Sequence, residues 1–156
     1  LLDRFFGYDL PEGEMADFEG FNNETDMETP YAYHYVGRHD KLCRILSEAD
    51  KFSFRDSRLS AGAGAIPGNN DSGGLSSCYI WNSLGLFPIS GQDLVLLSCP
   101  KFPQSKLTLA NGKTLTVKKS GEGICPLYVK FNGVTLKERK LTVIEMMFGG
   151  EIEFIM

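Results

Sequence analysis

Two polar segments hold the side chains of this 156-residue chain that could do chemistry. The first is Asn22-Asn23-Glu24-Thr25-Asp26. Asn, Thr and Asp are preferred helix caps and Glu suits a first helical turn, so capping explains Thr25 or Asp26. Capping does not explain Asn22, Asn23 and Glu24 together. A cluster of carboxylate and amide oxygens is also what a hard cation such as calcium requires. The segment therefore predicts a helix start and leaves a calcium site open.

The second segment is glycine-rich and carries one carboxylate. It runs over residues 67–74 and contains Asp71 and Ser72, either of which could cap a following helix. A carboxylate near the N–H groups of a helix start stays ionised at neutral pH, and an ionised carboxylate suits a general base. The segment is similar to part of an EF-hand, but the ligand spacing and the final Glu are absent. It predicts a cap or a base at Asp71.

The remaining reactive side chains favour structural roles. His34 is a lone histidine in a helical stretch, which is usually hydrogen-bonded, and Trp81 lies in an apolar stretch typical of a core. The four cysteines have apolar neighbours and no Cys-x-x-Cys spacing, so we expect buried free thiols, with a disulfide as the alternative; they are Cys43, Cys78, Cys99 and Cys125.

The elements that must position the two polar segments are helices in the first part of the chain. Hydrophobic periodicity predicts one helix over the run that contains Met27, Tyr31, Tyr35 and Val36, with Pro30 in its first turn and Gly37 as the stop signal. A second helix begins near Asp40, and a third covers residues 72–84. The glycine-rich residues 58–71 form a loop between the second and third helices, and such loops often carry function.

From about residue 91 the hydrophobic period becomes two, which indicates strands. Alternating segments surround two Asn-Gly pairs, Asn111-Gly112 and Asn132-Gly133, and each pair predicts a hairpin turn. About six strands are predicted, in an antiparallel sheet or a small sandwich. They cover residues 93–97, 106–109, 114–117, 127–131, 134–136 and 151–155.

Composition and charge exclude some classes of protein. The chain is 42% hydrophobic and has a formal net charge of −4 with acids and bases interspersed, so neither a membrane segment nor nucleic acid as a partner is predicted. Neither a signal peptide nor a phosphate-binding loop is visible. The chain opens without Met at the apolar run Leu1-Leu2-Asp3-Arg4-Phe5-Phe6, so we expect a fragment of a longer protein.

The two polar segments and their surroundings together resemble glycoside hydrolase family 92, the calcium-dependent exo-acting α-mannosidases. The resemblance covers roughly residues 17 to 156, in order and at family spacing. The helical part contributes Asn23-Glu24-Thr25-Asp26, Pro30-Tyr31-Ala32-Tyr33-His34-Tyr35-Val36-Gly37, residues 67–79 from Pro67-Gly68-Asn69-Asn70-Asp71 to Cys78-Tyr79, and Leu84-Gly85-Leu86-Phe87-Pro88. Residues 106–113 and 149–154 are similar to the family's C-terminal strands.

The resemblance implies a role for each matching position. Asp71 matches the catalytic base that activates water, and Asn69 matches a position that helps to hold this water. Asn23 and Glu24 match the calcium-binding segment, where the cation holds the mannose 2- and 3-hydroxyls. The implied reaction inverts configuration at the anomeric carbon of an α-mannoside glycan, with an α-1,2 linkage favoured and mannans or N-glycans as substrates. A secreted, periplasmic or cell-surface location is favoured.

The chain also departs from the family pattern. Thr25 replaces the usual Pro, Gly74 the usual Gln and Cys78 the usual Trp, which affects the substrate subsite more than the fold. The family's general acid is a glutamate whose segment would precede Leu1, so we expect the chain to need the remainder of the parent enzyme as its partner and to be inactive alone.

The expected architecture is α+β. Residues 1–90 are predicted to form the last helices of an α/α barrel with two active-site loops, and residues 91–156 a module of β-strands. Tyr31, Tyr33 and Tyr35 would form an exposed apolar cluster once their partner helices are missing. The alternatives are a non-catalytic carbohydrate-binding or structural β-module, and an interaction domain with no link to sugars.

Overall fold

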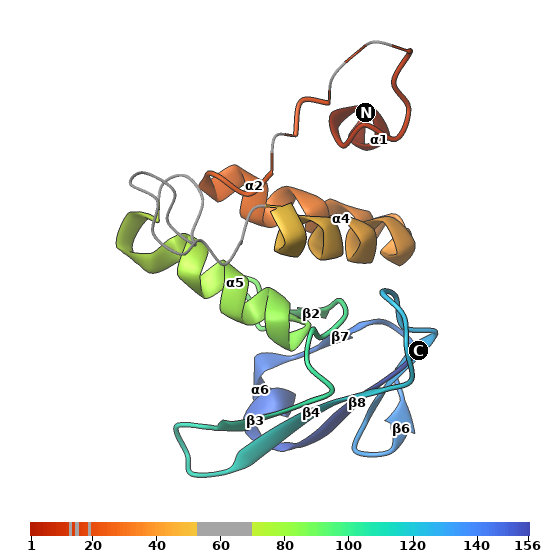
Figure 1. Ribbon diagram of the computed structural model, residues 1–156. Coiled ribbons are helices and arrows are strands. Elements are labelled where there is room, and N and C mark those ends of the chain that lie inside the picture. Colours follow the sequence, from red (N-terminus) through yellow and green to blue (C-terminus); the bar gives the residue numbers. More distant parts are fainter. Residues whose placement is uncertain (13, 15, 19, 53–69) are drawn as a thin grey trace. The chain divides into compact units, whose positions relative to one another are not determined.

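The computed structural model describes residues 1–12, 14, 16–18, 20–52 and 70–156. The chain divides into two compact units, Leu1–Tyr79 and Ile80–Met156, which we call unit 1 and unit 2 and describe separately. Unit 1 is helical and the strands belong to unit 2 (Figure 1). The predicted α+β class is confirmed, whereas the domain boundary at residues 90–91 stays a prediction. Among the described residues, no helix is both long and apolar enough to cross a membrane.

The helices before the first strand are mostly short. In chain order they are α1 (Leu2–Phe5), α2 (Glu24–Glu28), the 3-10 helix η1 (Thr29–Tyr31), α3 (Ala32–Tyr35), α4 (His39–Phe52), the 3-10 helix η2 (Asp71–Gly73) and α5 (Gly74–Leu84). The longest, α4, buries Leu42, Ile45 and Ala49 at helical spacing, as the sequence predicts. Most of the predicted loop at residues 58–71 lies outside the described residues.

The single helix predicted over the run from Met27 to Val36 is wrong in one respect. The structure has three short helices there, α2, η1 and α3, and Pro30 lies in the 3-10 segment between the two α-helices. Proline lacks the N–H that would bond the carbonyl of Asp26, and its ring clashes with the preceding turn. The α-helix that begins at Glu24 therefore gives way to a tighter turn at Thr29, and Pro30 lies in the first turn of this 3-10 helix, as the sequence predicts.

The prediction of an exposed tyrosine cluster is also wrong for two of its three members. Tyr31 and Tyr33 are each only 2% exposed, whereas Tyr35 is 66% exposed. The Tyr33 ring packs against the rings of Phe6 and Tyr8, with centroid distances of 5.6 and 6.4 Å. The first residues of the chain thus cover the Tyr33 side chain, which the sequence analysis predicts to be exposed.

A charged network fixes the Tyr33 hydroxyl. It donates a hydrogen bond of 2.6 Å to Oδ1 of Asp3, which also pairs with the ammonium of Lys41. Burial and the Asp3 carboxylate raise the pKa of Tyr33, so its hydroxyl remains a donor. The hydrogen bonds from Lys41 and Tyr33 lower the pKa of Asp3. This network ties the segment of α1 to α3 and α4.

Unit 2 contains two sheets, and Figure 1 shows α6 beside the larger one. The smaller sheet has the order β1 (Leu86–Pro88), β2 (Val95–Leu97) and β7 (Lys140–Leu141). The larger has the order β3 (Gln104–Thr108), β4 (Thr114–Ser120), β8 (Gly150–Ile155), β5 (Tyr128–Phe131) and β6 (Val134–Thr135). A short helix, α6 (Val143–Met147), precedes β8.

Both sheets of unit 2 contribute side chains to one core. Alternate residues of β4 and β8 point inward, and the fully buried members include Leu115, Val117, Ile152 and Phe154. Trp81, in the last turns of α5, packs against this core, as its apolar neighbours predict. The result is a small sandwich-like module.

The strands differ from the sequence prediction in their number and in the relative direction of one pair. The described residues form eight strands rather than about six, because the very short β1 and β7 were not predicted. The pair β4 and β8 is parallel, with Val117 opposite Ile152, so the larger sheet is mixed. The two hairpins at Asn-Gly pairs are confirmed: Phe131 pairs with Val134, and Thr108 with Thr114.

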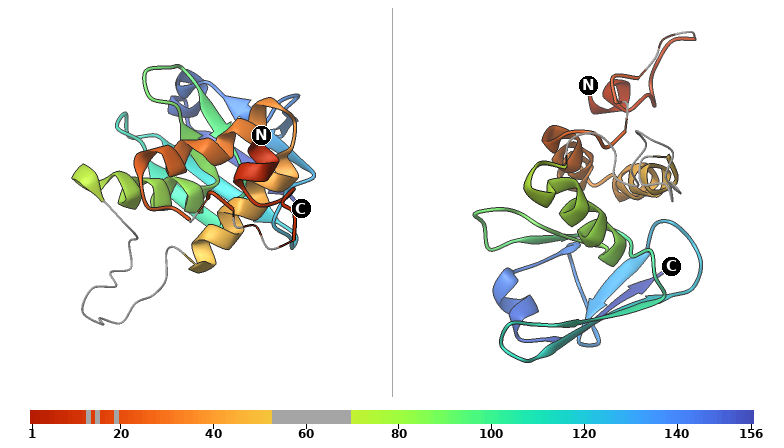
Figure 2. Two further views of the ribbon diagram at one scale, coloured as in Figure 1. Left: turned by 90° about the horizontal axis from the view of Figure 1, so that it is seen from above. Right: turned by 60° about the vertical axis from the view of Figure 1, so that its left-hand side comes forward.

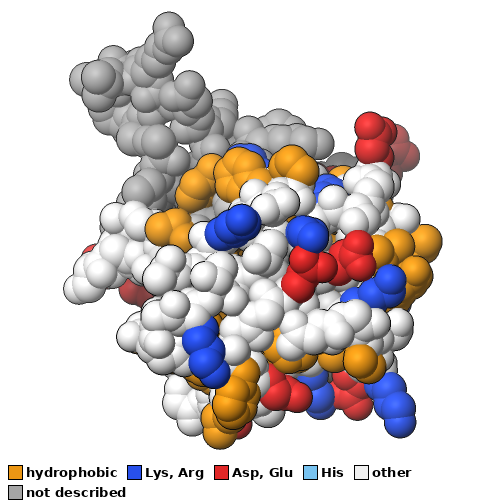
Figure 3. Space-filling model, turned by 90° about the horizontal axis from the view of Figure 1, so that it is seen from below, with side chains coloured by type: hydrophobic (Ala, Val, Ile, Leu, Met, Phe, Trp, Pro, Cys, Tyr) orange, Lys and Arg blue, Asp and Glu red, His pale blue; other side chains and the backbone are white. Residues whose placement is uncertain are grey.

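The outward side of the larger sheet carries ion pairs across neighbouring strands. Lys118 of β4 lies 2.5 Å from Glu151 of β8, and Lys130 of β5 lies 3.5 Å from Glu153. Acidic and basic side chains also lie next to one another in the view of Figure 3. Such partly exposed cross-strand pairs contribute little stability each, but they help to set the strand register.

All four cysteines are free thiols. Cys43 and Cys78 are buried, as predicted, and Cys99 and Cys125 are half-buried. Burial raises the pKa of the Cys99 thiol, which therefore remains protonated at neutral pH.

Gly85, between α5 and β1, provides a test of the packing in unit 2. Its φ is +72°, and a Cβ atom there would lie 2.6 Å from the backbone nitrogen of Pro100. We expect Gly85→Ala to lower the free energy of unfolding by about 3 kcal/mol, through left-handed strain and the clash together. The measurement is urea unfolding followed by the fluorescence of Trp81, the single tryptophan.

Gly112→Ala is the matched control. Gly112 has a φ of +79° but no atom within 4 Å of its Cβ position, so only the strain of about 1–2 kcal/mol remains. Equal losses in the two variants would contradict the close approach at Pro100.

Candidate functional site

The first polar segment is built around the start of α2. Oδ1 of Asn23 accepts a hydrogen bond from the N–H of Glu24 at 3.0 Å, and Oδ2 of Asp26 accepts one from the N–H of Asn23 at 3.1 Å. This reciprocal capping box makes Asn23 the cap, rather than Thr25 or Asp26 as the sequence suggests. The Glu24 side chain is exposed. Asn23 therefore has a structural role, and Glu24 is available to a ligand.

The second polar segment is held by Asn70. Its Oδ1 accepts hydrogen bonds from the backbone N–H and the hydroxyl of Ser76, at 2.9 and 3.1 Å. Its carbonyl accepts a 2.6 Å bond from the N–H of Gly73. Asp71, the next residue, begins η2 and is exposed. Asn69 lies outside the described residues.

A tight turn follows Asp71. Ser72 has a φ of +50° and Gly73 a φ of +86°, so the backbone is left-handed at two consecutive residues before α5 begins. The conformation costs a non-glycine residue about 1–2 kcal/mol. The Asn70–Ser76 hydrogen bonds close the loop over this turn and so stabilise it. The sequence analysis missed both residues of this clamp; the available signal was an Asn just before a helix start, a position that favours capping.

The structure brings the two polar segments together within unit 1. A Cβ atom on Gly74, the first residue of α5, would lie 3.5 Å from the Cε of Met27 in α2. Met27 also packs against a buried cluster that contains Leu75 and Cys78. Figures 1 and 2 show α2 beside the first turn of α5. Glu24 and Asp71 therefore lie at neighbouring ends of two helices in contact.

The two histidines of unit 1, His34 in α3 and His39 at the start of α4, have a partner in each other. Nε2 of His39 lies 2.9 Å from Nδ1 of His34, and the rings meet edge to face with centroids 4.8 Å apart. The prediction that His34 is hydrogen-bonded is confirmed.

The donor set at the two segments suits a hard cation in kind but is small. Glu24 offers an exposed carboxylate and Asn23 an amide oxygen with a second lone pair beside its capping bond. Calcium takes six to eight oxygen ligands. In the described part of the chain, no group of three or more His, Cys, Asp and Glu side chains is placed to hold a metal. A calcium ion here would need further oxygens from water, substrate or other protein segments.

Comparison with known families gives a match over nearly the whole chain. The model of the Glycosyl hydrolase family 92 catalytic domain matches residues 2–156. An uncharacterized secreted glycosidase of the fungus Arthroderma benhamiae is 32% identical over 97 residues, which are 62% of this chain and 12% of that protein.

Solved structures show the same fold. The family GH92 α-mannosidase BT3965 from Bacteroides thetaiotaomicron superimposes with a TM-score of 0.83 and 21% identity, over 99% of this chain and 20% of that protein. The same enzyme in complex with mannoimidazole gives 0.80 and 20% identity, over 99% and 21%. The family GH92 inverting mannosidase BT2199 from the same species gives 0.65 and 22% identity, over 83% and 17%. The chain thus spans at most about a fifth of the length of these proteins.

The turn at Asp71 can be tested with two adjacent glycines. Gly74 has an ordinary helical φ of −57° and room for a Cβ, so Gly74→Ala should raise the free energy of unfolding by about 0.5–1 kcal/mol. Gly73 has a φ of +86°, so Gly73→Ala should lower the free energy of unfolding by about 1–2 kcal/mol. Thermal unfolding followed by helical circular dichroism measures both. Changes of the same sign would contradict the backbone path described here.

Proposed function

Because the chain belongs to glycosyl hydrolase family 92, we propose that it forms the C-terminal part of an exo-acting, inverting, calcium-dependent α-mannosidase. Terminal α-linked mannose, with α-1,2 linkages preferred, would be removed from mannans or N-glycans. The observation that supports the proposal is the packing of Met27 in α2 against the cluster that contains Leu75 and Cys78 of α5, because Glu24 and Asp71 each lie within one turn of this packing. The mannosidase names of the structural relatives, one of them solved with mannoimidazole, support the substrate class.

Asp71 is proposed as the general base. Its side chain is exposed at the start of η2, in the loop that the Asn70–Ser76 clamp closes. It would take a proton from water as the water oxygen bonds to the anomeric carbon from the face opposite the leaving group. Asn69 is proposed to help hold this water. Inversion requires the base and the acid about 6.5–9.5 Å apart, with the water between the base and the sugar.

Glu24 and Asn23 are proposed as calcium ligands. Their oxygens match the cation in kind, and Glu24 is free of the capping bonds that occupy Asn23 and Asp26. When bound, calcium would supply a Lewis-acid contact to sugar hydroxyls. Asn23 orients the first turn of α2 and thereby the direction in which Glu24 projects. Asn23 would hold the helix start with one lone pair of Oδ1 and offer the other lone pair to the cation, which Glu24 would bind with its carboxylate.

The general acid is proposed to lie outside these residues. Protonation of the leaving oxygen needs a second carboxylic acid across the sugar from Asp71. Glu24 and Asp26, the acids described near the base, are assigned to the metal and to the capping box. The chain alone is therefore expected to show no turnover. We also propose a secreted, periplasmic or cell-surface location, because the curated relative is named a secreted glycosidase.

Replacement of Asp71 tests the base. In the full-length protein that carries these residues, we expect Asp71→Asn to lower kcat on an aryl α-mannoside by about 10²–10⁴-fold, because the isosteric amide cannot accept the proton from water. KM should change little. Asp17→Asn, at another exposed aspartate of unit 1, is the control and should leave kcat unchanged. Near-normal kcat in Asp71→Asn would reduce Asp71 to a structural residue.

Replacement of Glu24 tests the metal. Glu24→Gln should raise the calcium concentration needed for half-maximal activity by at least about tenfold, because a neutral amide binds the cation more weakly than a carboxylate. Glu28→Gln changes another exposed carboxylate on the same helix and should have no effect. If neither Glu24→Gln nor excess chelator altered activity, calcium would have no place in the reaction.

A further inference from the structure

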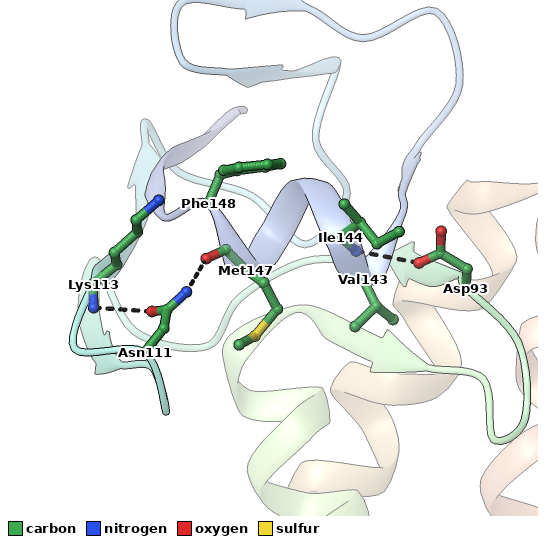
Figure 4. Close-up of a pocket in the computed structure, with 7 residues that line it drawn as sticks. All are labelled: Asp93, Asn111, Lys113, Val143, Ile144, Met147 and Phe148. Carbon is green, nitrogen blue, oxygen red and sulfur yellow. Dashed lines mark hydrogen bonds between the residues drawn. The ribbon is translucent and has the colours of Figure 1, made fainter.

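Unit 2 contains a surface pocket of about 260 Å³ that lies apart from the candidate catalytic residues in sequence and in structural unit. Its floor is formed by α6 and the residue after it, with Val143, Ile144, Met147 and Phe148. Lys113 and Asp93 are charged residues of its rim. In Figure 4, Lys113 and Phe148 lie at one end and Asp93 at the other, with the residues of α6 between them.

The aromatic side chain of this pocket is largely exposed. Phe148 is 66% exposed, and Nζ of Lys113 lies 4.9 Å from its ring centroid. Ile144, one helical turn earlier, is 62% exposed. An exposed ring with a cation over one face and a carboxylate at the other end of the pocket provides an open apolar face, a hydrogen-bond donor and a hydrogen-bond acceptor within one site.

The pocket is held in this shape by hydrogen bonds at both ends of α6. At the start, Thr142 and Glu145 form a capping box, and Oδ1 of Asp93 accepts a 3.2 Å bond from the N–H of Ile144. At the end, Nδ2 of Asn111 donates a 2.7 Å bond to the carbonyl of Met147. The ligand surface therefore needs little reorganisation, which lowers the entropy cost of binding.

The backbone after Phe148 is fixed as well. Gly149 has a φ of +74°, and a Cβ there would lie 2.7 Å from the carbonyl oxygen of Thr114. Only glycine fits this approach to β4. The exposure of Phe148 thus follows from a backbone path that the neighbouring strand constrains.

We propose that this pocket binds one pyranose unit of a neutral glycan. The C–H face of the sugar would lie on the Phe148 ring, Lys113 would donate a hydrogen bond to a ring hydroxyl and Asp93 would accept one. The volume is just below the range of about 300–1,000 Å³ typical of drug-sized ligands, so a single sugar fits better than a chain. The glycan class rests on the proposed function, whereas the pocket uses none of the proposed catalytic residues.

The test is a titration of the 156-residue chain with methyl α-mannopyranoside, up to about 50 mM, followed by backbone amide NMR shifts. We expect saturable shifts confined to residues near 93, 111–113 and 143–148. Phe148→Ala should weaken the binding at least about tenfold, and Lys113→Met should weaken it less. Phe102→Ala, which removes another exposed aromatic of unit 2 outside the pocket, should leave the binding unchanged.

Several results would overturn the proposal. They are the absence of saturable shifts in a chain whose unit 2 spectrum is well dispersed, shifts centred elsewhere, equal shifts with glycerol, and unchanged binding in Phe148→Ala. Failure of the proposed catalytic function is a separate outcome. The shifts should persist with excess chelator and in Asp71→Asn, so a protein that lacks mannosidase activity but retains these shifts would contradict the catalytic proposal alone.

Discussion

The candidate catalytic site depends on one packing contact, that of α2 against the first turn of α5. Met27 reaches Gly74 across this contact, and Leu75 and Cys78 are buried in the cluster that Met27 joins. Because Glu24 and Asp71 lie within a turn of these residues, burial of the cluster sets the separation of the two polar segments. A larger residue at position 74 is accommodated only as far as the flexible methionine yields. The proposed chemistry thus depends on a small apolar interface that contains none of the candidate catalytic or metal-binding residues.

Much of the β-module could be predicted because its signals are local. Strict alternation defines β4 and β8, and Asn132-Gly133 adopts positive φ at both positions, as a two-residue hairpin turn requires. The parallel pairing of β4 with β8 could not be predicted, because alternation shows which face is buried and gives no information on which distant strand is the neighbour. The two-residue strand β7 is too short to show a period at all.

The helical part was less predictable, because single residues and distant contacts decide it. Pro30 divides a periodic segment that otherwise reads as one helix. The burial of Tyr33 depends on Phe6 and Asp3, some thirty residues earlier in the chain, which no periodicity in the tyrosine segment can indicate. At the site, the motif resemblance indicates Asp71 and Glu24. The hydrogen bonds that hold the two segments come from Asn70 and Asn23. Neighbouring residues are equally good helix caps, so the sequence could not show which residue makes these bonds.

The structure also separates two requirements of catalysis, position and environment. Asp71 and Glu24 are positioned by helix starts and a tight turn, yet both side chains are exposed to solvent. Water weakens the electrostatic interaction between a charged side chain and the charge that develops in a transition state. The same side chain stabilises the transition state more once water is excluded from the site. The fold of unit 1 therefore supplies geometry at this site without supplying an enclosed, low-dielectric environment. For the proposed role of Asp71 as a base, a bound glycan or other protein segments would have to displace that water.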